Sequence, residues 1–425
     1  MGRGPDHRPV STLAAREAAL RILATVPRQP TLRIPLDDAL GCVLAEPLVS
    51  PLALPPWTNS AMDGYATRAD DVRGATTAEP IRLRVVEQIA AGSFPSRALQ
   101  SGECARIFTG APLPPGADGV IRQEDTDLGR NSVEIRNDRD AGVNIRLAGE
   151  DVQRGATVLE AGTELGAAEL GVLASLAVAH PLVFRRPRVG ILGGGDEIVD
   201  VDQPDAILSG RKIASSNSHT LHALVRLAGG EPLNLGLARD TLASVQAHLA
   251  RAPECDLLVT TAGISVGEHD HLRDAVTELG GSIDFWKLRM RPGAPVGFGQ
   301  VLGVPWIGLP GNPVSAMVTF ELFVRPAIRA MAGHRLPFRR TTPVRAAEAI
   351  SLKPALQHFL RAIVTDTPAG PEARLTGPQG SGILTSMVRA NALLVVPEGQ
   401  HETPTGSLMQ AIVLHDPVHA AEPGF

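Results

Sequence analysis

Acidic residues beside glycines mark the first place in this chain where side chains could do chemistry. The segment Gly193–Glu197 (GGGDE) directly follows the apolar run Val189–Leu192. Two acids at a glycine turn repel phosphate unless a cation lies between them, so the pattern favours a Mg²⁺-bridged or proton-handling site. The spacing is not the GxGxxG of a dinucleotide-binding loop.

Two more acidic segments stand at similar positions. Asp240 follows Arg239 at the expected start of a helix, where helix capping would explain it as well as chemistry would. Gly263–Asp270 (GISVGEHD) follows the apolar run Asp256–Thr260 and ends in an acid. All three acidic segments therefore come shortly after an expected strand.

Three cations and one rigid turn are candidates for anion binding. Lys287, Arg289 and Arg291 would share one face of an extended strand, because alternate residues point the same way. A solvated cationic face is the ordinary reading of such a run. Gly308–Ala316 (GLPGNPVSA) forms a turn of glycines and prolines that leads into an expected helix, and a helix N-terminus attracts anions.

The first 185 residues predict one helix followed by small β-rich modules. Ser11–Val26 is a helix candidate capped by Ser11 or Thr12, with its apolar residues near one face; these are Leu13, Leu20, Leu23 and Val26. Short β-like runs such as Ile81–Val86 and Ser132–Ile135 follow between about 31 and 160. Gly166–Phe184 predicts an apolar helix and a turn.

Strands and helices alternate from Val189 to about Ala332. A helix capped by Ser216 or Asn217 ends at Gly229–Gly230, a strand lies near Leu233–Leu237, and a helix begins at Asp240. This alternation predicts a parallel, doubly wound sheet, in which ligands bind beyond the carboxyl ends of the strands. The acidic segments fall at those ends. After Pro337 the pattern is again β-like.

Composition narrows the functional class. The formal charge of the 425 residues is −5, without a basic run, which argues against a nucleic-acid partner. No apolar run reaches the roughly 18 residues of a membrane span. The three cysteines and twelve histidines show no metal-ligand spacing. We expect reduced thiols, no membrane contact and a cytoplasmic location.

Several strings together resemble the MoeA family, the enzymes that insert molybdenum into molybdopterin, whose eukaryotic relatives include gephyrin and the plant Cnx proteins. They are Asn59–Ala66 (NSAMDGYA), Ile107–Pro112 (IFTGAP), the acidic segments and Leu309–Ala316 (LPGNPVSA), and they occur in the family's order from Ser60 to Ser381. Taken alone, the Asp63–Gly64 pair would be an ordinary turn. Phe359–Arg361 and Gly377–Ser381 would likewise be ordinary surface segments.

The resemblance implies a multidomain α/β plus β fold. Residues 10–185 would hold N-terminal domains I and II, with domain II at roughly 52–140. Residues 186–333 would form a central domain like MogA and MoaB, and residues 338–418 a small β-barrel, domain IV. The family forms homodimers, with a cleft between one subunit's central domain and the other's second domain.

The function implied is insertion of molybdate into adenylylated molybdopterin, with Mg²⁺-dependent release of AMP. A MogA- or MoaB-type adenylyltransferase is a further implied partner. The catalytic residues carried over are Asp63, Glu197, Asp240 and Asp270, with Asp240 and Asp270 as metal ligands. The substrate-binding residues carried over are Thr109, Asp151, Ser265, Lys287, Arg291, Asn312, Arg361 and Ser381.

Some positions depart from the family pattern and keep other readings open. Gly193 and Gly194 replace hydroxyl residues, Ala262 replaces Gly, Arg291 replaces Lys, and Ala294 replaces a second Lys. These departures are the evidence for one alternative, a catalytically impaired paralogue that binds molybdopterin or scaffolds partners as gephyrin does. A molybdopterin adenylyltransferase is the remaining alternative, although those shorter enzymes lack the flanking modules.

Overall fold

The structure is a computed structural model that describes residues 12–261, 271–352 and 356–415. It divides into two compact units. The larger unit comprises Met1–Ala45, Gly162–Ala167 and His180–Phe425, and the smaller unit comprises Glu46–Ala161 and Ala168–Ala179. Among the described residues, no helix is long and apolar enough to cross a membrane.

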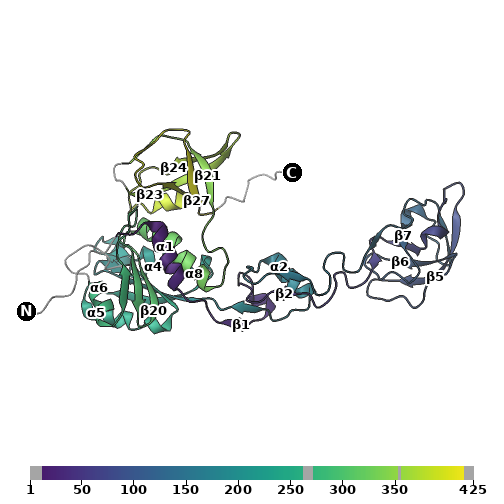
Figure 1. Cartoon of the computed structure of the whole chain (residues 1–425), viewed down its shortest axis with the longest axis horizontal. Helices are drawn as coiled ribbons and strands as arrows, with labels where there is room; N and C mark the ends of the chain where they lie inside the picture. The colour runs from purple at the N-terminus through teal and green to yellow at the C-terminus, as the bar shows by residue number, and fades with distance from the viewer. Residues whose placement is uncertain (1–11, 262–270, 353–355, 416–425) are drawn as a thin grey trace, which may run out of the picture. The chain divides into compact units, whose positions relative to one another are not determined.

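A six-stranded sheet is the centre of the larger unit (Figure 1). Its order is β15 (Glu231–Ala238), β12 (Arg188–Gly194), β16 (Leu257–Thr260), β20 (Val304–Gly308), β19 (Gly297–Val301) and β17 (Ser282–Phe285). The first four strands are parallel, as predicted. Strand β19 pairs antiparallel with both β20 and β17, and the turn at Leu302 and Gly303 joins it directly to β20.

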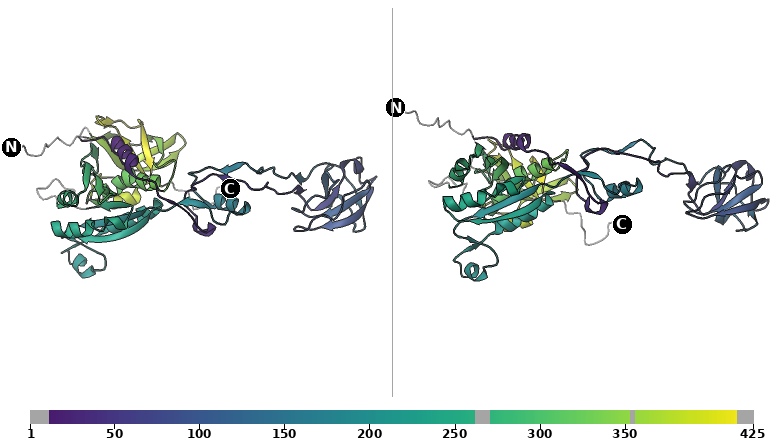
Figure 2. Two further views of the ribbon diagram at one scale, coloured as in Figure 1. Left: turned by 60° about the horizontal axis from the view of Figure 1, so that its bottom comes forward. Right: turned by 90° about the horizontal axis from the view of Figure 1, so that it is seen from below.

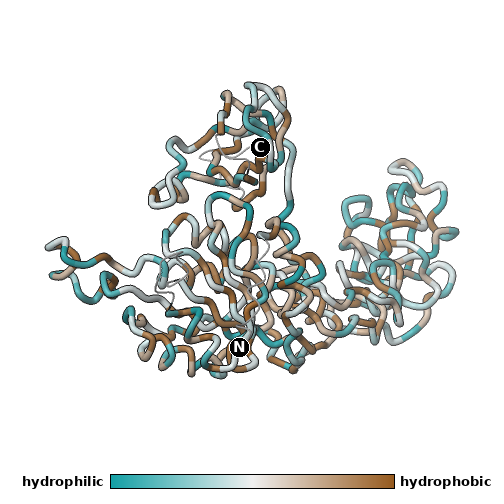
Figure 3. Tube along the Cα trace, turned by 60° about the vertical axis from the view of Figure 1, so that its left-hand side comes forward, coloured by the Kyte–Doolittle hydropathy of each residue, from teal (hydrophilic) through white to brown (hydrophobic). Residues whose placement is uncertain are grey.

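Helices cover both faces of this sheet because its strands are apolar on both sides. Val259 of β16 belongs to the core under α1 (Ala15–Thr25), α4 (Ser216–Leu227) and α8 (Arg325–Met331). The adjacent Leu258 belongs to the opposite core, under α5 (Leu242–Leu249) and α6 (His271–Glu278). Figure 3 shows hydrophobic and hydrophilic segments alternating along the trace of the chain.

Helix α1 differs from the prediction in both its start and its buried face. It begins at Ala15 without a side-chain cap, because Leu13 is already bridged to Leu288 in extended conformation. Its buried residues are Ala15, Ala18, Ala19 and Ile22. Leu20 is 46% exposed, so its place on the predicted face is wrong, whereas Leu13 is buried and Val26 packs against the same core. Figure 2 shows the purple α1 beside green and yellow segments from much later in the chain.

The proline-rich turn after β20 leads into a helix, as predicted. Asn312 precedes α7 (Pro313–Thr319), which continues through a π-helical turn (Phe320–Val324) into α8. Proline at the first helical position suits this start, because that position needs no amide donor. Asn217 of α4 fixes the turn by donating from Nδ2 to the carbonyl oxygen of Gly311 at 2.7 Å.

A closed β-barrel follows the central sheet. Its strands are β23 (Gln357–Thr367), β24 (Gly370–Leu375), β21 (Thr341–Ala346), β27 (Leu408–Val413) and β25 (Ala392–Val396), and pairing of β23 with β25 closes the ring. The two-residue strand β18 (Met290–Arg291), which comes from the central part of the chain, pairs in parallel with β23. The expected C-terminal β-barrel is therefore confirmed.

The smaller unit contains a five-stranded sheet. Its order is β7 (Gly119–Arg122), β4 (Gly64–Thr67), β6 (Glu103–Ile107), β5 (Ile81–Ile89) and β8 (Ser132–Ile135). The two β-runs identified in the sequence are β5 and β8.

Five short strand pairs complete the fold of the chain: β1 (Thr31–Arg33) with β11 (Leu182–Phe184), β2 (Leu48–Val49) with β10 (Thr157–Leu159), β3 (Asn59–Ser60) with β9 (Ile145–Arg146), β13 (Ile198–Val199) with β14 (Ile213–Ala214), and β22 (Ile350–Ser351) with β26 (Glu402–Thr403). The remaining helices are α2 (Ala167–Ser175), α3 (Pro204–Leu208) and α9 (Thr385–Arg389).

Candidate active site

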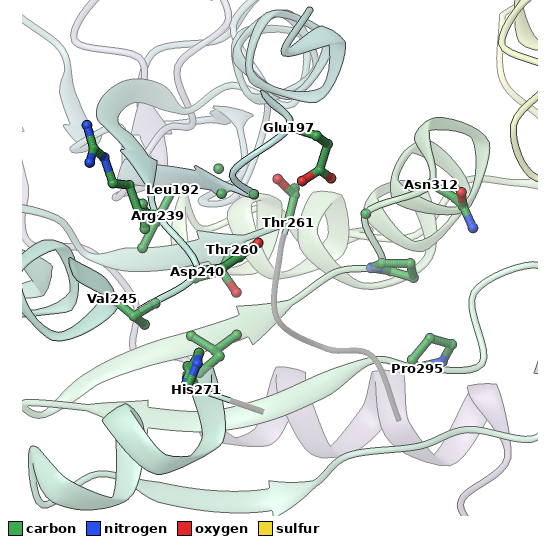
Figure 4. Close-up of a pocket in the computed structure, with 17 residues that line it drawn as sticks. Leu192, Glu197, Arg239, Asp240, Val245, Thr260, Thr261, His271, Pro295 and Asn312 are labelled. Atoms are coloured by element: carbon green, nitrogen blue, oxygen red, sulfur yellow. The ribbon is translucent and has the colours of Figure 1, made fainter. Parts of the chain in front are cut away.

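A cavity of about 640 Å³ lies beyond the carboxyl ends of β12, β15 and β16, where a parallel sheet is expected to bind its ligand. We call it the acidic pocket, because Glu197 and Asp240 both line it. Asn312, from the turn after β20, lines it as well. Figure 4 shows these three side chains arriving from three different loops. The structure thus brings together three residues that the sequence had separated.

Asp240 is not a helix cap. Helix α5 begins at Leu242, and the hydroxyl of Thr241 accepts the amide of Ser244 at 3.3 Å. The Asp240 carboxylate instead accepts the amide of Asp196 at 3.2 Å, and the amide of Asp240 donates to the Asp196 carboxylate at 3.3 Å. This reciprocal pair holds Asp240 at the pocket, where its carboxylate is exposed to a ligand.

Asp196 is a positioning residue that the sequence analysis passed over in favour of its neighbour Glu197. Besides its pair with Asp240, its carbonyl oxygen accepts Lys212 Nζ at 2.5 Å. The acidic loop is therefore tied to a cation that comes from the β13–β14 segment. The signal was present in the sequence, since Asp196 belongs to the same GGGDE string.

The position before the two acids requires a glycine, Gly195. Its φ is +127°, and a Cβ atom there would lie 2.8 Å from Oε2 of Glu197. Any other residue would therefore displace the Glu197 carboxylate from its place.

A second cavity, of about 390 Å³, lies where the barrel meets the central part of the chain. We call it the basic pocket, because two arginines line it. Its lining residues are Arg291, Pro292, Ser351, Leu352, His358, Leu360, Arg361, Gln379 and Gly380. Arg291 and His358 are paired in register between β18 and β23. This strand pairing brings Arg291 to the pocket that Arg361 also lines.

Arg361 is fully buried and bound to backbone oxygens. Its guanidinium donates to the carbonyl oxygens of Gln379 at 3.2 Å, Pro378 at 3.4 Å and Gly380 at 2.9 Å. Its Nε donates to the hydroxyl of Ser386 at 3.0 Å. Burial lowers the pKa of the Arg361 guanidinium below its ordinary value. An arginine stays protonated in proteins, so Arg361 gives the pocket a positive charge and also orders its loop.

The predicted cationic strand is wrong. Strand β17 ends at Phe285 in the central sheet, and β18 begins at Met290 in the barrel sheet, so Lys287 lies between two strands. Arg289 binds Glu398 at 3.1 Å and also the carbonyl oxygen of Thr12. Lys287 is exposed and does not line the basic pocket. Burial still alternates here, since Leu288 and Met290 are buried, but the chain changes sheets and no single strand carries all three cations.

Two short segments connect the acidic and basic pockets. Pro292 lines the basic pocket, and Pro295, three residues later, lines the acidic pocket. The amide of Val314, which follows the acidic-pocket residue Asn312 closely, donates to the carbonyl oxygen of Ser381 at 3.1 Å. Ser381 follows Gly380 of the basic pocket. Residues that line one pocket are therefore linked, through a few residues of chain or one hydrogen bond, to residues that line the other.

Asp63 and Thr109 form a clamp in the smaller unit. Thr109 donates to Oδ1 of Asp63 from both its amide and its hydroxyl, each at 2.8 Å. These two hydrogen bonds lower the pKa of Asp63 below its ordinary value of 3.8, so the carboxylate is ionised at neutral pH. Asp151, in the same unit, is exposed, and its amide donates to the carbonyl oxygen of Leu54 at 3.0 Å.

Replacing Thr109 with Val should raise the pKa of Asp63 part of the way toward 3.8, because the hydroxyl donor is lost while the backbone amide still donates. A depressed folded-state pKa stabilises the fold above 3.8 and loses that contribution as the pH falls through the folded value. The pH-dependent difference between wild type and variant should therefore disappear in strong acid. NMR titration of the Asp63 carboxylate measures the shift, with Thr76→Val as the control. An unchanged pKa in Thr109→Val would contradict the clamp.

Ser265 and Asp270 lie outside the described residues. Within the described ranges, no group of three or more His, Cys, Asp or Glu residues is arranged to hold a metal ion. Glu197 and Asp240 are therefore the described carboxylates that line the acidic pocket.

Comparison with protein families accounts for all three parts of the chain. Three family models align in order: the MoeA N-terminal region (domain I and II) at residues 13–177, a probable molybdopterin binding domain at 190–330, and the MoeA C-terminal region (domain IV) at 343–414. The chain is 40% identical to Molybdopterin molybdenumtransferase 2 of Mycobacterium tuberculosis over 89% of its own length and 93% of the relative. This chain belongs to the MoeA family.

Other MoeA relatives agree in length and fold. The molybdopterin molybdenumtransferase of Nostoc sp. is 35% identical, and the match covers 97% of this chain and 96% of the relative. The crystal structure of the molybdopterin biosynthesis MoeA protein from Pyrococcus horikoshii OT3 has a TM-score of 0.80 at 29% identity. That match covers 95% of this chain and 100% of the solved one. The family fold expected from the sequence is confirmed.

Proposed function

We propose that this chain is a molybdopterin molybdenumtransferase that acts in molybdenum cofactor biosynthesis. It binds adenylylated molybdopterin and molybdate, releases AMP and transfers molybdenum to the dithiolene of molybdopterin. Its relatives carry this activity in their names, and their sequences cover nearly all of this chain. Residues 10–185, 186–333 and 338–418 are the proposed domain limits.

The observation that carries the proposal is a pair of pockets of opposite character joined by two short segments. The acidic pocket, at the strand ends, suits the adenylylated substrate, whose phosphates need a cation between them and Glu197 and Asp240. The basic pocket, with Arg291 and Arg361, suits a tetrahedral oxyanion such as molybdate. A reaction between the two substrates needs such neighbouring sites.

The acidic pocket fits Mg²⁺ as a cofactor. Mg²⁺ prefers oxygen ligands and keeps several waters, so one or two carboxylates together with substrate phosphates are enough to hold it. Glu197 and Asp240 offer those carboxylates on adjacent loops. Asp270 is the further ligand proposed from the family resemblance. When bound, the ion would neutralise phosphate charge and polarise the link to be cleaved.

The reaction gives the direct test of this function. Adenylylated molybdopterin is mixed with excess protein in the presence of Mg²⁺, and AMP is measured in a single turnover with and without molybdate. We expect release that depends on molybdate. Release without molybdate, or formation of the adenylate from molybdopterin and ATP, would instead favour an adenylyltransferase. Binding without any release would favour the impaired paralogue.

We also propose, from the family resemblance, that the site is completed in a homodimer, with Asp63 and Thr109 contributed by the partner of the subunit that holds Asp240. Mixing inactive Asp63→Ala and Asp240→Ala proteins should then restore up to about a quarter of the wild-type activity, because some mixed dimers contain one intact site. Subunit exchange is verified with two affinity tags. Absence of recovery in exchanged dimers would place all these residues in one chain.

A further inference from the structure

A third cavity adjoins the acidic pocket, and neither of the two proposed substrates has been assigned to it. It measures about 400 Å³, and its lining includes the hydroxyl and amide side chains of Ser215, Ser216 and Asn217 at the start of α4. We call it the hydroxyl lobe. Six of its lining residues also line the acidic pocket: Gly193, Gly194, Glu197, Thr261, Gly311 and Asn312. The two cavities therefore form one continuous space around the end of β12.

Ser215 does not have the usual role of a serine before a helix. Such a serine normally accepts an amide of the first helical turn. Ser215 makes no such bond, although it directly precedes α4. Its hydroxyl instead lies 2.6 Å from the hydroxyl of Ser218. The first turn of α4, a helix of 12 residues, is left without a side-chain cap on the side that faces the lobe.

The geometry of this serine pair leaves one hydroxyl hydrogen to donate. Two hydroxyls that share one hydrogen bond use one hydrogen between them. Neither oxygen has another hydrogen-bond partner in the described part of the chain. Ser215 lines the lobe and is only 5% exposed, whereas Ser218 is not among the lining residues. Ser218 can therefore donate to Ser215, which leaves the Ser215 hydrogen to point into the lobe.

Gly193 provides the room for this pair. A Cβ atom at position 193 would lie 3.3 Å from Oγ of Ser218 and 3.8 Å from Oγ of Ser215. It would also lie 2.6 Å from a terminal methyl group of Leu237. The serine hydroxyls and this methyl group thus take up the space of a side chain at the strand end. Only a residue without a side chain leaves them undisturbed.

We propose that Ser215 donates a hydrogen bond to a phosphate oxygen of the adenylylated substrate, and that Ser218 is the positioning residue that orients it. A phosphate fits this place because it accepts hydrogen bonds without donating them, and because the start of a helix attracts negative charge. Glu197 is the acidic residue in the lobe's lining, and it is shared with the pocket proposed to hold Mg²⁺. This inference rests on the proposed function and deepens it.

The test uses AMP and adenosine as probes of the intact protein, with affinities measured by calorimetry in the presence of Mg²⁺. A hydrogen bond to a charged group is worth enough that Ser215→Ala should weaken AMP binding about tenfold. Adenosine, which lacks the phosphate, should bind both proteins equally. Ser282→Ala, at an exposed position of β17 at the edge of the same sheet, is the matched control. Thermal unfolding confirms that each variant is folded.

A rescue experiment separates a phosphate contact from a merely structural role. Gly193→Ser alone should not tighten AMP binding, because its side chain competes with Ser218 and Leu237 for space. Ser215→Thr, which keeps a hydroxyl at the same position, should instead restore most of the affinity that Ser215→Ala loses. Equal AMP affinity in wild type and Ser215→Ala, equal loss for adenosine, or no rescue would each overturn the inference. The proposed function fails separately, if wild type releases no AMP in response to molybdate.

Discussion

Asp240→Asn should lower molybdate-dependent AMP release by about 100-fold or more, the lower end of what positioned acid–base groups contribute. The side chain keeps its size, and its amide oxygen can still accept the Asp196 amide, so the loop should stay in place. What the variant loses is the negative charge in the acidic pocket. Since Thr241 caps α5, the stability of that helix should not change.

The matched control for Asp240 is Asp274→Asn, which removes the same charge from the exposed face of α6. Single-turnover release and thermal unfolding are measured on both variants. Turnover of Asp240→Asn at the wild-type rate would return Asp240 to a structural role in the loop. A fall in the melting temperature of Asp240→Asn alone would show that the Asp196 pair depends on the charge.

Arg361→Met should weaken molybdate binding by more than about tenfold and should also destabilise the barrel. The methionine is similar in length but removes the positive charge of the basic pocket. It leaves the carbonyl oxygens of Pro378, Gln379 and Gly380 without their donor, and each unsatisfied buried group costs about 1–3 kcal/mol. Arg361→Lys should give intermediate values, because one ammonium cannot reach all these oxygens.

Two measurements separate the effect of Arg361→Met on molybdate binding from its effect on stability. The molybdate concentration that gives half-maximal AMP release reports the binding, and thermal unfolding reports the stability. Arg374→Met, at an exposed position of β24 in the same barrel, is the control. A destabilised variant with unchanged molybdate dependence would place the oxyanion outside the basic pocket. No change in either measurement would contradict the buried hydrogen-bond network.

The strand ends were predictable from the sequence because they depend on local pattern. Apolar runs such as Val189–Leu192 end at glycines, and the sheet then brings Glu197 and Asp240 to one edge. The shift of the helix cap to Thr241 was not predictable, since Asp240 is an equally good cap by residue type. What decided it is the Asp196 pair, a contact between loops 44 residues apart in sequence.

The basic pocket was less predictable than the acidic one. The burial of Arg361 depends on carbonyl oxygens contributed by a separate loop, and no property of the arginine itself reveals them. The single strand proposed for Lys287 and Arg291 was wrong because the chain passes from the central sheet to the barrel sheet between Phe285 and Met290, which side-chain alternation cannot reveal. From the sequence, glycine at position 193 in place of the family's hydroxyl residue suggested a loss of hydrogen bonds at the site. In the structure, the hydroxyls of Ser215 and Ser218 lie beside that position.

Because β18 pairs with β23, the central domain and the C-terminal barrel depend on each other structurally. Arg291 precedes the barrel by about fifty residues of chain, yet its backbone is held in register by His358 of the barrel. Cutting the chain before Thr341 would therefore remove Arg361 and also release Arg291 from its place. Insertions and recombination between the two modules are constrained for the same reason, since a barrel from another protein must reproduce this one short register.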